Sequence, residues 1–68
     1  MRILDMTTFV TLARHRHFGR AAQELHTTQP AISIRLAAME QEFGCKLLNR
    51  TGRDFALTPA GERVLQTF

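Results

Sequence analysis

Eight of the nine basic side chains in this 68-residue sequence are arginines, and their placement indicates binding rather than catalysis. The planar guanidinium group of arginine matches phosphate oxygens and guanine edges. The net charge of +3 favours a nucleic-acid partner only weakly, since many soluble domains carry a similar charge. The arginines placed to rim a binding surface are Arg20, Arg35, Arg50 and Arg53.

Patterns typical of catalysis or metal binding do not stand out. There is no Ser–His–Asp spacing, glycine-rich phosphate loop or carboxylate pair, and a chain of this size buries too little surface for a deep catalytic cavity. His15 and His17 cannot face one metal from a helix, and neither they nor His26 have a cysteine or carboxylate cluster nearby. We therefore expect no enzyme activity, no metal and no cofactor.

Cysteine usage and hydropathy bear on the compartment. The single cysteine, Cys45, excludes an internal disulfide and fits a reducing cytoplasm. A lone cysteine in this position is more often a small packed residue than a redox sensor. No apolar run approaches the roughly 18 residues of a membrane span. We expect a cytoplasmic protein without a membrane partner.

The pattern over residues 28–44 predicts one helix with two unlike faces. Thr28 suits the N-cap, Pro30 fits the first turn and Gly44 supplies the stop. Such a helix could enter a DNA major groove, or it could be an amphipathic helix that is merely rich in alanine. The stripe expected in the core is Ile32, Leu36, Met39 and Phe43. The opposite face carries only small or uncharged residues, namely Pro30, Ser33, Ile34, Ala37, Ala38 and Gln41.

Two shorter helices are expected before residue 28. The first runs from an N-cap at Asp5 to about residue 16, with Leu12 well off its core stripe. The second covers about residues 18–25, where two adjacent alanines allow close approach of another helix. A turn of two or three residues gives residues 18–37 the outline of a helix-turn-helix. The core stripe of the first helix is Met6, Phe9, Val10 and Ala13.

After Gly44 the pattern predicts a hairpin and then a helix. Short runs at residues 47–50 and 55–57 flank a polar connector with a glycine, so residues 47–57 should form a wing with Arg50 and Arg53 at its tip. Thr58 and Pro59 form a favoured helix start. The chain stops in the middle of this helix. We expect a fragment, with one domain over residues 1–57 and the start of a linker helix over residues 58–68.

Four groups of residues, in this order and spacing, resemble the N-terminal DNA-binding domain of LysR-type transcriptional regulators over essentially the whole chain. They are Phe9-Val10; Phe18 with Arg20-Ala21-Ala22 and Leu25; residues 28–33; and Gly44, Leu47 and Arg50 with residues 57–61. The resemblance implies a mainly α winged helix-turn-helix, with a three-helix core, a two-stranded wing and the start of a linker helix.

The resemblance also implies a function. The third helix would read the major groove of double-stranded DNA, the wing would touch the flanking backbone or minor groove, and the fourth helix would pair with a second copy. A small-molecule effector would act only through a C-terminal domain that these residues do not include. Among the positions that depart from the family pattern, His17 replaces a common serine and Ile34 stands where an arginine often occurs. An arginine contact cannot be carried over to Ile34.

We predict a base-reading group in the first turns of the third helix. Gln29 can pair with adenine, Ser33 can bond to several bases, and Ile34 would meet a thymine methyl group. The complete predicted group is Gln29, Pro30, Ser33 and Ile34. The residues predicted to contact the DNA backbone or minor groove are Arg20, Thr28, Arg35, Arg50, Thr51 and Arg53.

The dimer seam implied by the family is predicted from apolar residues that the core leaves over. Because this seam is small, we expect a monomer or weak dimer that pairs mainly on DNA. A second class of function stays open, in which a winged-helix module docks its third helix on a protein. Steep salt dependence of duplex binding would favour DNA over protein. The predicted seam residues are Leu12, Val64, Leu65 and Phe68.

Overall fold

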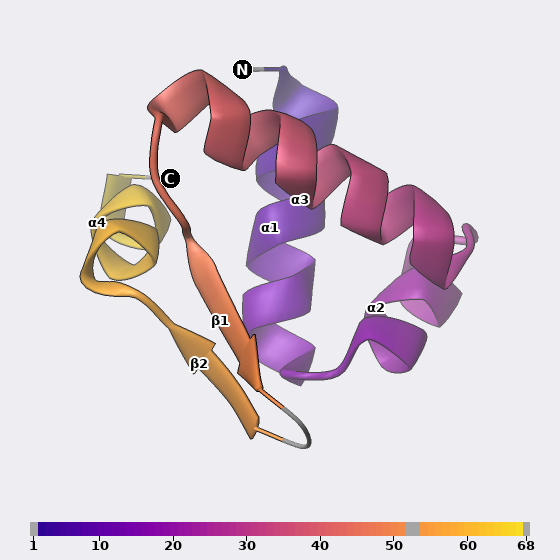
Figure 1. Ribbon diagram of the computed structural model, residues 1–68. Coiled ribbons are helices and arrows are strands. Elements are labelled where there is room, and N and C mark those ends of the chain that lie inside the picture. Colours follow the sequence, from indigo (N-terminus) through magenta and orange to yellow (C-terminus); the bar gives the residue numbers. More distant parts are fainter. Residues whose placement is uncertain (1, 52–53, 68) are drawn as a thin grey trace.

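The computed structural model describes residues 2–51 and 54–67, which form helices around one antiparallel hairpin. In Figure 1, α3 crosses in front of α1, α2 lies beside one end of α3, and α4 lies on the outer side of the hairpin. This is the mainly α winged helix-turn-helix expected from the sequence. The elements are α1 (Ile3–His15), α2 (Phe18–Glu24), α3 (Gln29–Phe43), β1 (Leu48–Thr51), β2 (Asp54–Leu57) and α4 (Pro59–Thr67).

The ends of α3 are set by the residues that the sequence singled out. The Thr28 hydroxyl oxygen accepts a hydrogen bond from the Ala31 N–H at 3.2 Å, and Pro30 lies in the first turn. Gly44 ends the helix at φ 72°, a left-handed conformation that glycine adopts without steric cost. The predicted bounds of this helix are confirmed.

The start of α1 differs from the prediction. The helix begins at Ile3, so Asp5 is its third residue and not its N-cap. From there the Asp5 carboxylate accepts a hydrogen bond from the Arg2 backbone N–H at 3.2 Å. An acidic residue in the first turn also interacts favourably with the helix dipole. Asp5 therefore stabilises this helix end from inside the helix.

The buried face of α1 is rotated relative to the predicted stripe. Leu12 is 1% exposed and belongs to the core, whereas Val10 is 37% exposed. The cause is a pair of buried threonines, Thr8 and Thr11, on the inner face. Thr8 can be buried because its hydroxyl donates to the Leu4 carbonyl oxygen at 2.8 Å, so no polar group is left unsatisfied.

One core joins the three helices to the hairpin. Phe43, predicted to face it, is 42% exposed at the end of α3. Close approach of α2 is possible because Ala21 and Ala22 lie on its buried face, as predicted. The buried apolar residues of the described chain are Phe9, Leu12, Phe18, Ala21, Ala22, Ile32, Leu36, Met39, Leu47 and Leu48.

The hairpin and α4 are connected through Thr58. Leu48 pairs with Leu57 at the base of the hairpin. The Thr58 hydroxyl donates to the Lys46 carbonyl oxygen at 2.6 Å and accepts from the Gly61 N–H at 3.0 Å, which confirms Thr58 as the cap. A Cβ on Gly61 would lie 2.0 Å from the Leu47 carbonyl oxygen, so α4 packs here only because this residue is glycine.

Candidate nucleic-acid interface

The predicted base-reading group lies together on the outer side of the first turns of α3. All four of its side chains are exposed, and Ile34 is 70% exposed. Such solvent exposure of an apolar side chain is unfavourable unless a partner covers it. Further along the same face, Ala37, Ala38 and Gln41 are also exposed. The outer face of α3 is therefore accessible and carries no charge.

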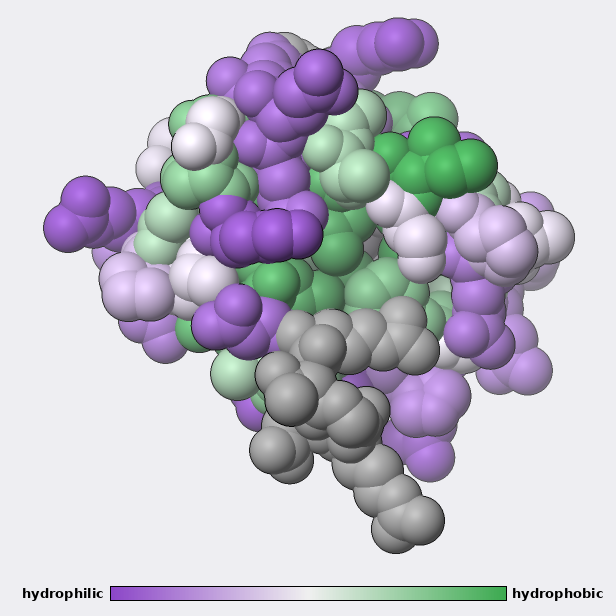
Figure 2. All heavy atoms as spheres, in the orientation of Figure 1, coloured by the Kyte–Doolittle hydropathy of each residue, from purple (hydrophilic) through white to green (hydrophobic). Residues whose placement is uncertain are grey.

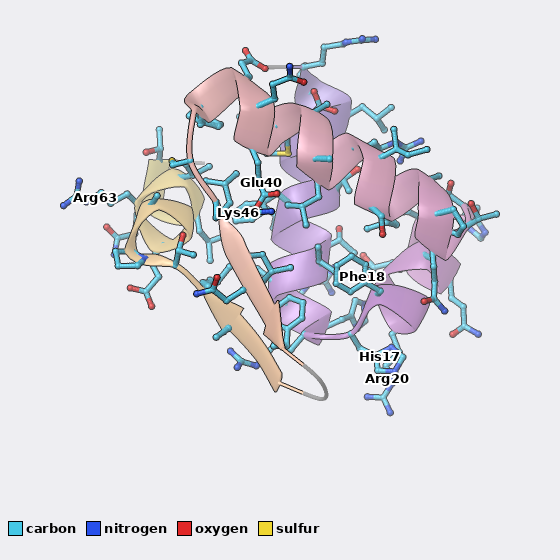
Figure 3. All side chains as sticks on the ribbon, in the orientation of Figure 1. His17, Phe18, Arg20, Glu40, Lys46 and Arg63 are labelled. Atoms are coloured by element: carbon cyan, nitrogen blue, oxygen red, sulfur yellow. The ribbon has the colours of Figure 1, made fainter. Side chains whose placement is uncertain are left out.

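A shallow cleft beside this group joins α2 to the start of α3. His17, the residue before α2, and Arg20 of α2 line one side of it, and Gln29 lines it from α3. The sequence left the cap of α2 open; the structure assigns it to His17, whose Nδ1 accepts from the Arg20 N–H at 3.1 Å. A Cβ at Gly19 would lie 2.9 Å from the His17 ring, so this glycine makes room for the capping imidazole. Arg20 is exposed and points outward with His17 (Figure 3).

Arg35, predicted to contact the DNA backbone, lies on a different side of α3. Its Nη1 donates to the Thr8 hydroxyl oxygen of α1 at 3.4 Å, and the side chain is half-buried. The reason is helical geometry: position 35 is about 40° from the buried Met39 around the axis. Arg35 therefore lies off the exposed outer face, and its predicted contact with the DNA backbone stays a prediction.

Arg16 connects the corner between α1 and α2 to the hairpin. Its guanidinium donates a hydrogen bond to the Phe55 carbonyl oxygen and lies 5.6 Å from the centroid of the Phe55 ring. The Phe55 ring in turn packs edge-on against Phe18, with 6.1 Å between centroids. This link could not be predicted from the sequence, because an arginine after a helix gives no signal of a distant backbone partner.

The predicted wing contacts fall at the limit of the described chain. Backbone pairing places Arg50 opposite Phe55 and Thr51 opposite Asp54, as expected for a hairpin. The side chains of Arg50 and Thr51, and Arg53 as a whole, lie outside the described residues. Their predicted contacts with backbone or minor groove stay predictions.

A groove of about 340 Å³ separates α3 from β1. Figure 2 shows a hollow there with hydrophobic atoms on its floor and hydrophilic residues at its edge. Glu40, on the α3 side, is 13% exposed at its side chain. Its Oε2 accepts from the Leu47 N–H at 2.8 Å and from the Leu48 N–H at 3.3 Å. Glu40 therefore fixes the start of the hairpin to α3, a role that the sequence analysis missed.

An exposed ionic cluster joins α1 to α2. Glu24 accepts hydrogen bonds from His15, at 2.7 Å from Nε2, and from Arg14. The hydrogen bond with His15, followed by that with Arg14, lowers the pKa of Glu24 below its usual value of 4.5. These groups lie at the surface, so the cluster contributes little to stability.

The predicted dimer seam is only partly available. Leu12 is excluded because it is buried in the core of its own chain. Val64 and Leu65 are half-buried and pack against that core, which leaves part of each side chain accessible. Phe68 lies outside the described residues.

Residues 2–51 and 54–67 contain no group of three potential metal ligands. Within the same ranges, no helix is both long enough and apolar enough to cross a membrane.

The helices, hairpin and exposed third helix define the class of protein as a winged helix-turn-helix. The chain belongs to the LysR family, because the model of the family described as bacterial regulatory helix-turn-helix protein, lysR family, matches residues 3–62. This is a family of transcription regulators and not of enzymes.

Individual relatives agree with this assignment. The chain is 47% identical over 60 residues to the HTH-type transcriptional regulator HdfR of Yersinia enterocolitica, covering 88% of the chain and 20% of the relative. A LysR-family regulator from Eggerthella lenta superimposes with a TM-score of 0.93 at 34% identity, covering 98% of this chain and 96% of that one. The DNA-binding domain of CbnR in a complex with DNA has a TM-score of 0.93 at 33% identity, covering 98% and 77%. The chain thus spans about a fifth of the length of the curated relatives it matches.

Proposed function

We propose that this chain binds double-stranded DNA in a sequence-specific way, as the N-terminal module of a bacterial LysR-type transcriptional regulator. The third helix enters the major groove, and the wing contacts the flanking backbone or minor groove. The observation that carries this proposal is the exposed, uncharged outer face of α3, positioned by a helix-turn-helix. The proposal is also supported by the crystal structure of the CbnR DNA-binding domain, which has the same fold, in a complex with DNA.

The residue roles follow from exposure and chemistry. Gln29, Pro30, Ser33 and Ile34 read base edges, because they are exposed together at the start of α3. Phosphate or minor-groove contacts are assigned to exposed residues beside α3 and to the wing, where basic and hydroxyl side chains suit phosphate oxygens. These residues are Arg20, Thr28, Arg50, Thr51 and Arg53.

Assembly and location follow from the same proposal. Residues 1–57 form the DNA-binding unit, and residues 58–68 begin a linker helix that pairs with a second copy through the accessible parts of Val64 and Leu65. Phe68 extends that seam. The seam is small, so pairing is weak off DNA and stronger when two half-sites align the subunits. The protein acts in the cytoplasm, and an effector acts through a further domain of the whole regulator.

The first experiment measures binding of a fluorescent mixed-sequence duplex by anisotropy at several salt concentrations. The logarithm of the affinity should fall linearly and steeply with the logarithm of salt, because each phosphate contact releases counterions. Sedimentation of the same samples tests the pairing, which duplex DNA should strengthen. Binding that does not change with salt would reject DNA and favour a winged helix that docks on another protein.

A second experiment tests sequence reading. A duplex is first selected from a random pool, and the Ile34→Ala variant is then compared with the unchanged chain on single-base variants of that duplex. We expect relaxed preference at one or two base pairs, at a cost of about 1–3 kcal/mol at most. Val10→Ala removes an exposed apolar side chain from α1 and should leave base preference unchanged. Equal preference in Ile34→Ala and the unchanged chain would show that Ile34 does not read bases.

A further inference from the structure

The groove between α3 and β1, which we call the strand groove, has a polar rim above an apolar floor. Its rim contains an amine, an amide and a hydroxyl group, all on exposed residues. Its floor consists of buried side chains from the core. The rim residues are Ser33, Lys46 and Asn49, and the floor residues are Phe18, Leu36 and Leu48.

The position of the strand groove determines what would pass through it. In duplex DNA, one sugar–phosphate strand separates the major groove from the neighbouring minor groove. A protein that places α3 in the first and its hairpin against the second must therefore straddle that strand. The strand groove lies between these two elements. This step rests on the proposed function.

Lys46 carries the charge that such a strand requires. It lies two residues before β1, and its side chain is 77% exposed. Its Nζ lies 3.8 Å from Oε1 of Glu40, and Figure 3 shows the two residues next to each other in the space between α3 and β1. The distance is long and the amine itself is exposed, so the pair is weak and the amine can turn to a phosphate at little cost.

The backbone that carries Lys46 is held on both sides. Glu40 accepts hydrogen bonds from the two N–H groups that follow Lys46, and the Thr58 hydroxyl donates to the carbonyl oxygen of Lys46 itself. These backbone N–H groups still stabilise the Glu40 carboxylate when the Lys46 amine turns to a phosphate. Such preorganisation favours binding because less freedom is lost on contact.

We propose that the strand groove receives the DNA strand that divides the two grooves, with Lys46 and Asn49 contacting its phosphate oxygens. Asn49 is exposed on the same rim, and its amide can donate to phosphate as Lys46 does. Glu40 acts as a positioning residue, because it fixes the backbone from which Lys46 extends. Ser33, whose hydroxyl shares the rim, keeps its base-reading role on the adjacent face.

The test compares Lys46→Gln with Arg63→Gln, since each variant removes one positive charge. Arg63 extends from α4 away from the rest of the molecule (Figure 3). Lys46→Gln should weaken duplex binding about fivefold, the equivalent of one hydrogen bond. It should also reduce the salt slope by about 0.9, the value for one phosphate contact. Arg63→Gln should change both the duplex affinity and the salt slope less than Lys46→Gln does. Equal effects of the two variants would mean that only net charge matters, and would overturn the proposal.

A second measurement locates the phosphate. Single phosphates of the selected duplex are replaced, one position at a time, by neutral methylphosphonates. The unchanged chain should lose affinity at one or two positions between the base pairs read by α3 and the flank, whereas Lys46→Gln should show no further loss there. Equal losses in both chains would overturn the proposal. If the unchanged chain bound no duplex in a salt-dependent way, the proposed function itself would fail.

The role of Glu40 is tested by the same methylphosphonate scan. Glu40→Gln keeps one acceptor oxygen for the backbone N–H groups and should retain the position of the sensitive phosphate. Glu40→Ala has no acceptor, so that position should shift or disappear while the base preference of α3 persists. Circular dichroism checks that each variant remains folded. An unchanged phosphate position in Glu40→Ala would show that Glu40 does not position Lys46.

Discussion

The two sides of this protein are held together by different kinds of contact. On the helix-turn-helix side, α2 packs through Ala21 and Ala22, and apolar burial joins the helices. On the hairpin side, polar side chains also bind backbone groups outside their own helix. Glu40 accepts from the start of the hairpin, and Arg16 donates to the Phe55 carbonyl oxygen. Apolar packing thus holds the helices and the hairpin in one core, and on the hairpin side polar links to backbone atoms also fix the direction of the wing.

This difference leads to unequal sensitivities. Burial energy is spread over many contacts but is large for each fully buried side chain. A single side chain-to-backbone hydrogen bond contributes less to stability, yet its direction fixes geometry. Substitutions in the helical core should therefore change folding stability most, and substitutions at the polar links should change DNA contacts more than stability.

The largest effect is expected for Leu12→Ala. Leu12 is fully buried, so the change should lower the free energy of unfolding by about 2–5 kcal/mol. Urea denaturation measures this, and Val10→Ala on the exposed side of α1 is the matched control. If Leu12→Ala instead kept full stability and weakened only self-association in sedimentation, Leu12 would belong to a dimer seam after all.

A smaller loss is expected for Gly61→Ala. Alanine normally stabilises a helix interior by about 1 kcal/mol relative to glycine. Here the new methyl group would meet the Leu47 carbonyl oxygen, and overpacking of this kind costs about 1–3 kcal/mol. We expect a net loss in urea denaturation, with exposed Glu62→Ala as the control on the same helix. A gain in stability would show that α4 does not pack this closely.

The smallest effect is expected for Glu24→Gln at the surface. The hydrogen bonds from His15 and Arg14 lower the pKa of Glu24, so its carboxylate stabilises the fold above its usual pKa of 4.5. That contribution is lost as the pH falls through the lowered pKa. Urea denaturation should show a slight deficit for Glu24→Gln at pH 7 that disappears well below pH 4.5. A deficit that stayed constant with pH would point to packing instead of charge.

Local chemistry in the sequence was sufficient to predict the ends of α3, the hairpin and the start of α4. The helix caps made by Thr28, Gly44 and Thr58 act within three or four residues of those positions, so these capping roles follow from local rules. The face of α1 was mispredicted because buried threonines look polar in a hydrophobic pattern. Thr8 is buried at no polar cost only because it bonds to its own helix.

The candidate site was predictable to a similar extent. The exposed group at the start of α3 followed from helical spacing, since its residues share one face. The links made by Glu40 and Arg16 did not, because each joins a side chain to a backbone atom whose position only the fold defines. Lys46 likewise becomes a phosphate candidate only when β1 is seen to lie across a groove from α3.

The Thr58 hydroxyl couples the position of α4 to the residues that precede the hairpin. It bonds at once to the Lys46 carbonyl oxygen and to the first turn of α4, so one oxygen atom is shared by the entrance of the hairpin and the helix after it. A rotation of α4 would therefore be transmitted to the backbone of Lys46 through these two hydrogen bonds. We expect a rotation of α4 to tilt the hairpin relative to α3, and so to change the contacts with DNA without unfolding the core.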